Sequence, residues 1–237
     1  MRRGLLTACT ILALTACDRL PGRPRDTDRP LRPAQVMDFT TLYGEHCAGC
    51  HGDEHRPGAA VGLTDPTYLA LIDGEVLRRV IADGVPGTAM PGFAEGAGGP
   101  LTEPQVALLA REMRGRWGRP GVLGDGTPPA YAAAPGDPDR GAQVYAAFCA
   151  SCHGPSGRGG THGGSIVDGA YLALVSDQGL RTAVLVGRPG LGMPDWRGDD
   201  KDRPMAAEEV ADVVAWLIAR RPQFPGQPDP TPEAPDG

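Results

Sequence analysis

Two short stretches of the chain combine cysteine and histidine at a spacing that carries chemistry. They are Cys47-Ala-Gly-Cys50-His51 and Cys149-Ala-Ser-Cys152-His153. The Cys-x-x-Cys-His spacing is typical of covalent haem attachment, in which both thiols bind the porphyrin and the adjacent histidine ligates the iron. Two matches far exceed chance in a chain with only 6 cysteines and 5 histidines. We therefore expect two covalently bound haem c groups, with His51 and His153 as iron ligands.

Other chemistries for the same four cysteines fit their spacing less well. A disulfide framework of four cysteines would allow three pairings, but it would not require a histidine after each pair. A zinc site needs four soft or borderline ligands gathered in one place. A thioredoxin-like redox site needs a βαβ setting, which the sequence lacks. These alternatives remain open to a structural test.

The chain also contains an internal repeat. Cys47, Cys50 and His51 recur 102 residues later, and a longer series recurs at 103 residues. This series consists of Asp65, Tyr68, Leu69, Ala70, Leu71, Leu77, Arg78, Gly84, Pro86, Gly87, Met90 and Pro91, which return as Asp168, Tyr171, Leu172, Ala173, Leu174, Leu180, Arg181, Gly187, Pro189, Gly190, Met193 and Pro194. The one-residue drift is explained by a single loop insertion. The chain is therefore a tandem duplication.

Each half resembles a class I c-type cytochrome, and the whole is similar to the periplasmic dihaem cytochromes c. The resemblance covers residues 36–118, the first half, and 137–222, the second half. It implies an all-α fold, with two small helical shells that each surround a haem. It also implies a sixth iron ligand, a loop methionine usually followed by proline. Met90-Pro91 and Met193-Pro194 stand 39 and 40 residues after the histidines and match that pattern.

Helices must position these residues, and the apolar pattern predicts where. Before the two motifs, apolar residues share one helix face at Phe39, Leu42 and Tyr43, and again at Val144, Tyr145 and Phe148. Near the end of each half, the same spacing recurs at Val106, Leu109, Ala110, Met113 and Trp117, and at Val210, Val213, Val214, Leu217 and Ile218. Thr102 and Glu103 suit a helix start. No alternating run suggests a sheet, so we expect helices joined by Gly-rich loops.

One position differs between the halves in a way that bears on helix packing. The related cytochromes often have a small residue where the first and last helices cross. Gly141 fits that pattern, whereas its repeat partner is Phe39. We therefore expect a looser helix crossing in the first half.

The N-terminal residues predict export and lipidation. Arg2 and Arg3 precede an apolar run over 5–16, which is too short for a membrane span but suits a signal peptide. Leu14-Thr15-Ala16-Cys17 resembles a bacterial lipobox, which implies lipidation of Cys17. Asp18 resembles the inner-membrane retention signal of enteric lipoproteins. The alternative is an ordinary cleaved signal with an incidental cysteine, and both readings place the protein outside the cytoplasm, on the periplasmic side of a membrane.

Composition completes the domain organisation. Segments rich in proline flank and separate the halves, among 35 glycines and 25 prolines. The segment between the halves could be a free linker or ordered coil. The predicted divisions are a signal peptide (1–16), a lipidated tether (17–35), a first cytochrome c domain (36–118), a linker (119–136), a second cytochrome c domain (137–222) and an acidic tail (223–237).

The function follows from the predicted ligands. Iron held by histidine and methionine has no vacant position for a substrate, so one-electron transfer remains. We expect a membrane-anchored electron-transfer protein, not an enzyme, that links a quinol-oxidising complex or dehydrogenase to an acceptor such as a terminal oxidase. A subunit fixed in a respiratory complex would use the same chemistry, and a dihaem peroxidase is the enzymatic alternative.

Other candidate ligands and partners are weaker. His46 or His55 could replace methionine in a bis-histidine site, but both lie so close to the attachment residues that the far face of the haem is hard to reach. We expect His162 to be a solvated loop residue. The net charge is −6 and no basic stretch occurs, which argues against a nucleic-acid partner. We expect redox proteins and a membrane as partners, and no small-molecule substrate.

Overall fold

The structure, a computed structural model, describes residues 30–125, 127–198 and 203–223. The chain divides into two units, 1–36 and 37–237. The described part of the first unit contains one 3-10 turn, η3 (Pro33–Gln35), in which the Gln35 side chain accepts a hydrogen bond from the Arg32 backbone. The expected signal peptide, Cys17, residues 17–29 of the tether and residues 224–237 of the tail lie outside the described residues.

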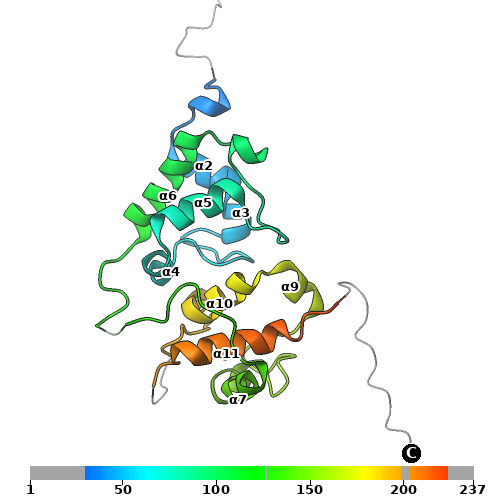
Figure 1. The fold of residues 1–237 in the computed structure, drawn as a ribbon. Helices are drawn as coiled ribbons and strands as arrows, with labels where there is room; N and C mark the ends of the chain where they lie inside the picture. Colours follow the sequence, from blue (N-terminus) through cyan, green and yellow to red (C-terminus); the bar gives the residue numbers. More distant parts are fainter. Residues whose placement is uncertain (1–29, 126, 199–202, 224–237) are drawn as a thin grey trace, which may run out of the picture. The chain divides into compact units, whose positions relative to one another are not determined.

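The second unit repeats one series of helices (Figure 1). The first half contains α2 (Phe39–His46), α3 (Ala48–His51), α4 (Pro66–Leu71), α5 (Gly74–Asp83), η4 (Glu95–Ala97) and α6 (Glu103–Trp117). The second half contains α7 (Pro138–Phe148), α8 (Ala150–His153), α9 (Gly169–Leu174), α10 (Asp177–Val186), η5 (Pro189–Leu191) and α11 (Ala207–Ile218). Only three isolated β-bridges and no strand occur among the described residues, which confirms the all-α prediction.

The helices before the two motifs form as the apolar pattern predicts. Asp38 begins α2 by accepting a hydrogen bond from the Thr41 backbone, and α2 buries Phe39, Leu42 and Tyr43. In the second half, α7 begins after Asp137, whose carboxylate accepts from the first-turn backbone. Val144 and Tyr145 are buried there, whereas the ring of Phe148 lies half-buried beneath the Arg203 guanidinium.

The last helix of each half supplies a large part of the remaining apolar core. As predicted, α6 follows the cap residue Thr102 and begins at Glu103, and the Gln105 side chain accepts from the Thr102 backbone at 2.9 Å. The second-half helix α11 begins at Ala207. Both helices turn their predicted apolar faces inward. The buried members are Val106, Leu109, Ala110 and Met113 in α6, and Val210, Val213, Val214 and Leu217 in α11.

The helix crossings differ between the halves as the sequence predicts. In the second half, α7 crosses α11 at Gly141, where an added Cβ would lie 2.1 Å from the Asp212 carbonyl oxygen. This close approach gives α7 and α11 a more extensive contact than α2 has with α6. In the first half the bulky Phe39 instead packs edge-on against Trp117, with ring centroids 5.4 Å apart. The contact between these two helices is thus made by side-chain rings at this position.

The described parts of the segment between the halves, 119–125 and 127–136, are ordered coil. Arg181 of α10 donates to the Ala130 carbonyl from Nε and Nη2, at 3.1 and 2.7 Å. Arg197 donates to the Val122 carbonyl at 2.9 Å. The ring of Tyr131 also packs edge-on against Tyr68 of α4. Of the two possibilities for this segment, the structure therefore favours coil packed on the protein.

No helix within the described residues combines the length and apolarity that a bilayer span requires.

Candidate functional site

Each cysteine-histidine motif forms a single helical turn. In the first half, the backbone N–H groups of Cys50 and His51 both donate to the Cys47 carbonyl, at 3.2 and 3.0 Å. The equivalent hydrogen bonds in α8 have the same lengths. Residues at i, i+3 and i+4 share one helix face, so the turn presents two thiols and an imidazole on the same side. The structure thus brings together the three predicted attachment residues in both halves.

The four motif cysteines are free thiols, and burial lowers the acidity of the first cysteine of each pair. Desolvation raises the pKa of Cys47 to about 12 and that of Cys149 to about 11. Redox-active dithiols require the opposite shift, because the thiolate is the nucleophile. The thioredoxin-like and disulfide alternatives therefore lack support. Within the described residues no group of three or more histidine, cysteine or acidic side chains is arranged to hold a metal ion.

Both motif histidines are oriented by a backbone carbonyl from the following loop. His51 Nδ1 lies 2.7 Å from the Val61 carbonyl oxygen, and His153 Nδ1 lies 2.8 Å from that of Gly164. A carbonyl only accepts, so Nδ1 carries the proton and Nε2 keeps the lone pair that an iron ion requires. Burial lowers the pKa of His51 and favours the neutral imidazole, although the bond to Val61 opposes that shift.

Sequence reasoning did not identify the groups that hold these loops. The residue before each carbonyl, Ala60 or Gly163, donates its N–H to the carbonyl of the second motif cysteine, at 2.9 and 3.0 Å. The hydroxyl of Tyr43 donates to the Gly52 carbonyl just after the first motif, and Tyr145 does the same at Gly154. A signal for the tyrosines was present, because each stands four residues before the first cysteine of its motif.

The two predicted methionine ligands occupy equivalent loops. Met90 follows α5, and its carbonyl accepts from the Val85 backbone at 3.0 Å. Met193 follows α10, and its carbonyl accepts from Arg188 at 2.8 Å. Both side chains are half-buried, whereas the core residue Met113 has no exposed surface. This contrast argues against a packing role for Met90 and Met193, and their ligation of iron stays a prediction.

Glycines at the ends of α5 and α10 allow these loops to close. Gly84 and Gly187 have φ of 72° and 66°, a left-handed conformation that favours glycine. A Cβ at either position would lie 2.6 Å from the carbonyl oxygen of Met90 or Met193. The close approach fixes each methionine loop against the helix that precedes it.

The remaining histidines have other surroundings. His46 ends α2, and its ring meets that of Phe93 edge-on at a centroid distance of 6.0 Å. His55 and His162 are exposed. In each half the donor set is therefore two free thiols, one imidazole nitrogen and one half-buried thioether on matching elements. That set suits haem c, which needs the thiols for attachment and the other two donors for iron.

Comparison with known proteins gives a consistent result. The family described as "Cytochrome C oxidase, cbb3-type, subunit III" matches residues 34–110 and 136–217, which is more than half of the chain. The chain is 27% identical to "Cbb3-type cytochrome c oxidase subunit FixPc" of Rhizobium leguminosarum bv. viciae, over 73% of this chain and 58% of that protein. It is 26% identical to "Cytochrome bc1 complex cytochrome c subunit" of Corynebacterium efficiens, over 78% and 62% respectively.

A third relative, "Cbb3-type cytochrome c oxidase subunit FixP" of Bradyrhizobium sp., is 29% identical over 67% of this chain and 53% of its own length. The chain thus spans about three fifths of the length of the curated relatives it matches.

Proposed function

The chain belongs to the cytochrome c family described as cbb3-type cytochrome c oxidase subunit III, and from that premise we propose that it is a dihaem electron carrier anchored to a bacterial membrane. Membership of this family implies covalently bound haem c. The proposal assigns one haem to residues 36–118 and one to 137–222. Single electrons then pass from a respiratory donor, either a quinol-oxidising complex or a dehydrogenase, to an acceptor such as a terminal oxidase.

The duplicated donor set is the observation that carries this proposal. In each half the two cysteines would hold the porphyrin, and a backbone carbonyl orients the histidine through Nδ1. Met90 and Met193 would each supply a thioether ligand to the iron. Bound haem supplies reversible one-electron chemistry, and a thioether ligand favours its reduced state. With a histidine and a methionine of each half committed to the iron, the proposal leaves no position for a substrate.

The named relatives guide the choice of partners. FixPc is named as a subunit of a cbb3-type oxidase, and the Corynebacterium efficiens protein as a cytochrome c subunit of a bc1 complex. We assign donor and acceptor to these two classes of respiratory complex. The first half contains 11 acidic and 6 basic residues, so it favours a partner with a basic surface. Association should weaken as salt screens these charges.

The membrane anchor is proposed from Leu14-Thr15-Ala16-Cys17. The two or three acyl chains of a lipidated N-terminal cysteine anchor a protein stably to the membrane, whereas a single acyl chain binds only marginally. With Asp18 next in sequence, we assign the protein to the periplasmic side of the inner membrane. Cys17→Ser should release the protein or leave it unprocessed, while Cys9→Ser, within the same leader, should change neither. Unchanged processing and membrane attachment of the Cys17→Ser protein would refute the anchor.

Mass spectrometry tests haem attachment directly. The mature protein should retain two haem additions after acid denaturation, because thioether bonds survive unfolding. Cys149→Ala combined with Cys152→Ala should retain one addition and serves as the internal control. A wild-type mass that corresponds to free thiols or a disulfide at either motif would contradict the proposal.

A further inference from the structure

Arg188 links the methionine loop of the second half to the histidine loop of the first half. Its backbone pairs with Met193, through Arg188 N–H to the Met193 carbonyl at 2.8 Å and the reverse bond at 3.1 Å. Its side chain contacts the first half of the chain. Nη2 donates to the Gly58 carbonyl at 2.5 Å and lies 3.5 Å from the carbonyl oxygen of Ala60.

The loop that receives this guanidinium is the one that orients His51. The Ala60 N–H is bonded to the Cys50 carbonyl, and the next residue, Val61, accepts from His51 Nδ1 at 2.7 Å. A short series of hydrogen bonds and backbone therefore runs from the predicted iron ligand His51 to the predicted iron ligand Met193. Arg188 is the residue at which this series crosses from one half to the other.

The loop geometry does not by itself require an arginine. The repeat partner of Arg188 is Val85, whose N–H makes the same loop bond, to the Met90 carbonyl at 3.0 Å. An apolar side chain therefore suffices to close a loop of this kind. The arginine side chain adds the contact with the other half, and it lies half-buried in a cleft of about 380 Å³ that His51 and Gly58 also line.

We propose that Arg188 is a positioning residue that couples the two haem sites. The inference rests on the proposed function, because it requires haem at both motifs. By holding the Met193 loop against the His51 loop, Arg188 fixes the path along which one site takes up the electron that the other loses. The charge of Arg188 does not change when the electron passes between the sites, and the transfer requires no proton. A fixed cation beside the first site also favours the reduced state there.

Three variants separate this role from a simple effect of charge. Arg188→Val installs the repeat partner and removes the contact. Arg188→Lys keeps a cationic donor that can reach the same carbonyls. Arg56→Gln is the matched control, because it removes a positive charge from the same histidine loop and leaves the Arg188 contact intact. All three are prepared as the two-haem protein and checked by mass and far-ultraviolet circular dichroism.

Optical redox titration gives the potentials, and pulse radiolysis gives the rate at which electrons equilibrate between the sites. Arg188→Val should lower the equilibrium constant for reduction of the first site about tenfold, which lowers its reduction potential by about 59 mV. It should also slow electron equilibration between the sites at least tenfold. Arg188→Lys should restore most of that rate, and Arg56→Gln should leave it unchanged.

If Arg188→Val retains two haems with the wild-type potentials and rate, the coupling role is wrong and the proposed function stands. A chain that binds one haem overturns both.

If Arg188→Val does not fold, Arg188→Lys carries the test. The proposal is overturned if electrons equilibrate much more slowly in Arg188→Lys than in Arg56→Gln while both reduction potentials are unchanged. That result would mean that a cationic donor at position 188 does not suffice for coupling. A rate equal to that of the wild-type protein supports the proposal.

Discussion

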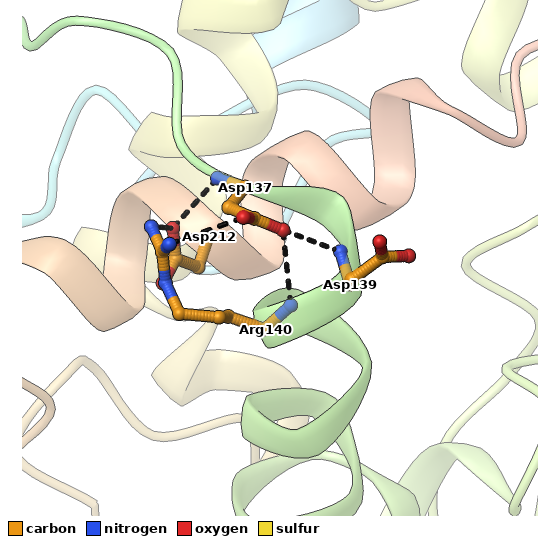
Figure 2. A network of polar contacts seen from close by, with 4 residues as sticks. All are labelled: Asp137, Asp139, Arg140 and Asp212. Atoms are coloured by element: carbon orange, nitrogen blue, oxygen red, sulfur yellow. Dashed lines mark hydrogen bonds and ion pairs between the residues drawn. The ribbon is translucent and has the colours of Figure 1, made fainter.

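The carboxylate of Asp212 and the guanidinium of Arg140 form a two-bond ion pair that joins α11 to α7. The Nε–Oδ2 and Nη2–Oδ1 distances are both 2.8 Å. Asp212 also accepts from the backbone N–H of Asp137 at 2.7 Å, so one carboxylate ties the start of α7 to the middle of α11 (Figure 2). Its side chain is 5% exposed, which makes these hydrogen bonds hard for water to replace.

Replacing this carboxylate should destabilise the second half. Asp212→Ala leaves the Asp137 N–H and the guanidinium without their acceptor, and we expect a loss of about 2 kcal/mol in the free energy of unfolding. Urea unfolding followed by circular dichroism measures the change. Asp139→Asn removes a nearby exposed carboxylate that makes no bond to α11. It should lower the free energy of unfolding by only a few tenths of the loss expected for Asp212→Ala. Equal losses in the two variants would contradict the role of Asp212.

The same ion pair gives a pH dependence. Bonds from Arg140, and then from the Asp137 backbone, hold the pKa of Asp212 below its ordinary value against the opposing effect of burial. A lowered native pKa means that the unfolded chain binds the proton more tightly. The stabilisation is therefore complete at neutral pH, and it declines as pH falls below the unfolded value of about 3.9 and through the native one.

The stability difference between wild type and Asp212→Asn should thus shrink when urea midpoints are measured at pH values descending from neutral to about 3. A difference that grows toward acid pH would show that Asp212 is not held as a carboxylate in the folded protein.

The helix crossing gives a third prediction. Gly141→Ala places a methyl group 2.1 Å from the Asp212 carbonyl oxygen and 2.8 Å from Trp216 Cβ, so α7 must move away from α11. We expect a loss of about 2 kcal/mol or more, as for other overpacked sites. Gly115→Ala, in α6 with nothing near the added methyl group, should instead stabilise by about 0.5–1 kcal/mol. Thermal unfolding of both variants checks the contrast, and a neutral Gly141→Ala would contradict the close crossing.

The comparison of sequence with structure shows which features periodicity can predict. The helix face of Phe39, Leu42 and Tyr43 and the start of α6 at Glu103 followed from local pattern and capping, and both are present. The different crossings at Gly141 and Phe39 followed from side-chain size. Such features depend on residues close in sequence or on a comparison between the two repeats.

Helices too short to show a period, and features that depend on distant contacts, were not predicted. The short helices α4 and α9 were missed as helices, although Asp65-Pro66 and Asp168 are good starts, because six residues are too few to show a period. The carbonyls of Val61 and Gly164 are invisible in sequence, since any residue offers one. The contact of Arg188 with Gly58 joins residues 130 positions apart and exists only when both halves are folded.

The methionine loop gives a fourth prediction. Gly187 and Gly192 both have positive φ, of 66° and 79°, so alanine costs backbone strain at either position. Only at Gly187 would the methyl group also meet the carbonyls of Met193 and Pro194. Gly187→Ala should therefore displace Met193 and remove about half of the near-infrared band of sulfur-ligated ferric haem, with one haem in two affected. Gly192→Ala should keep the band, and equal bands in both variants would argue against Met193 as a ligand.

The central claim is that the chain holds two haems closed by protein ligands on both faces. An optical redox titration of the mature protein, with carbon monoxide added to the reduced form, tests it most directly. We predict two one-electron transitions per chain, with neither reduced haem binding carbon monoxide. A single transition per chain, or a haem that binds carbon monoxide and turns over peroxide rapidly, would contradict the electron-carrier account and favour the peroxidase alternative.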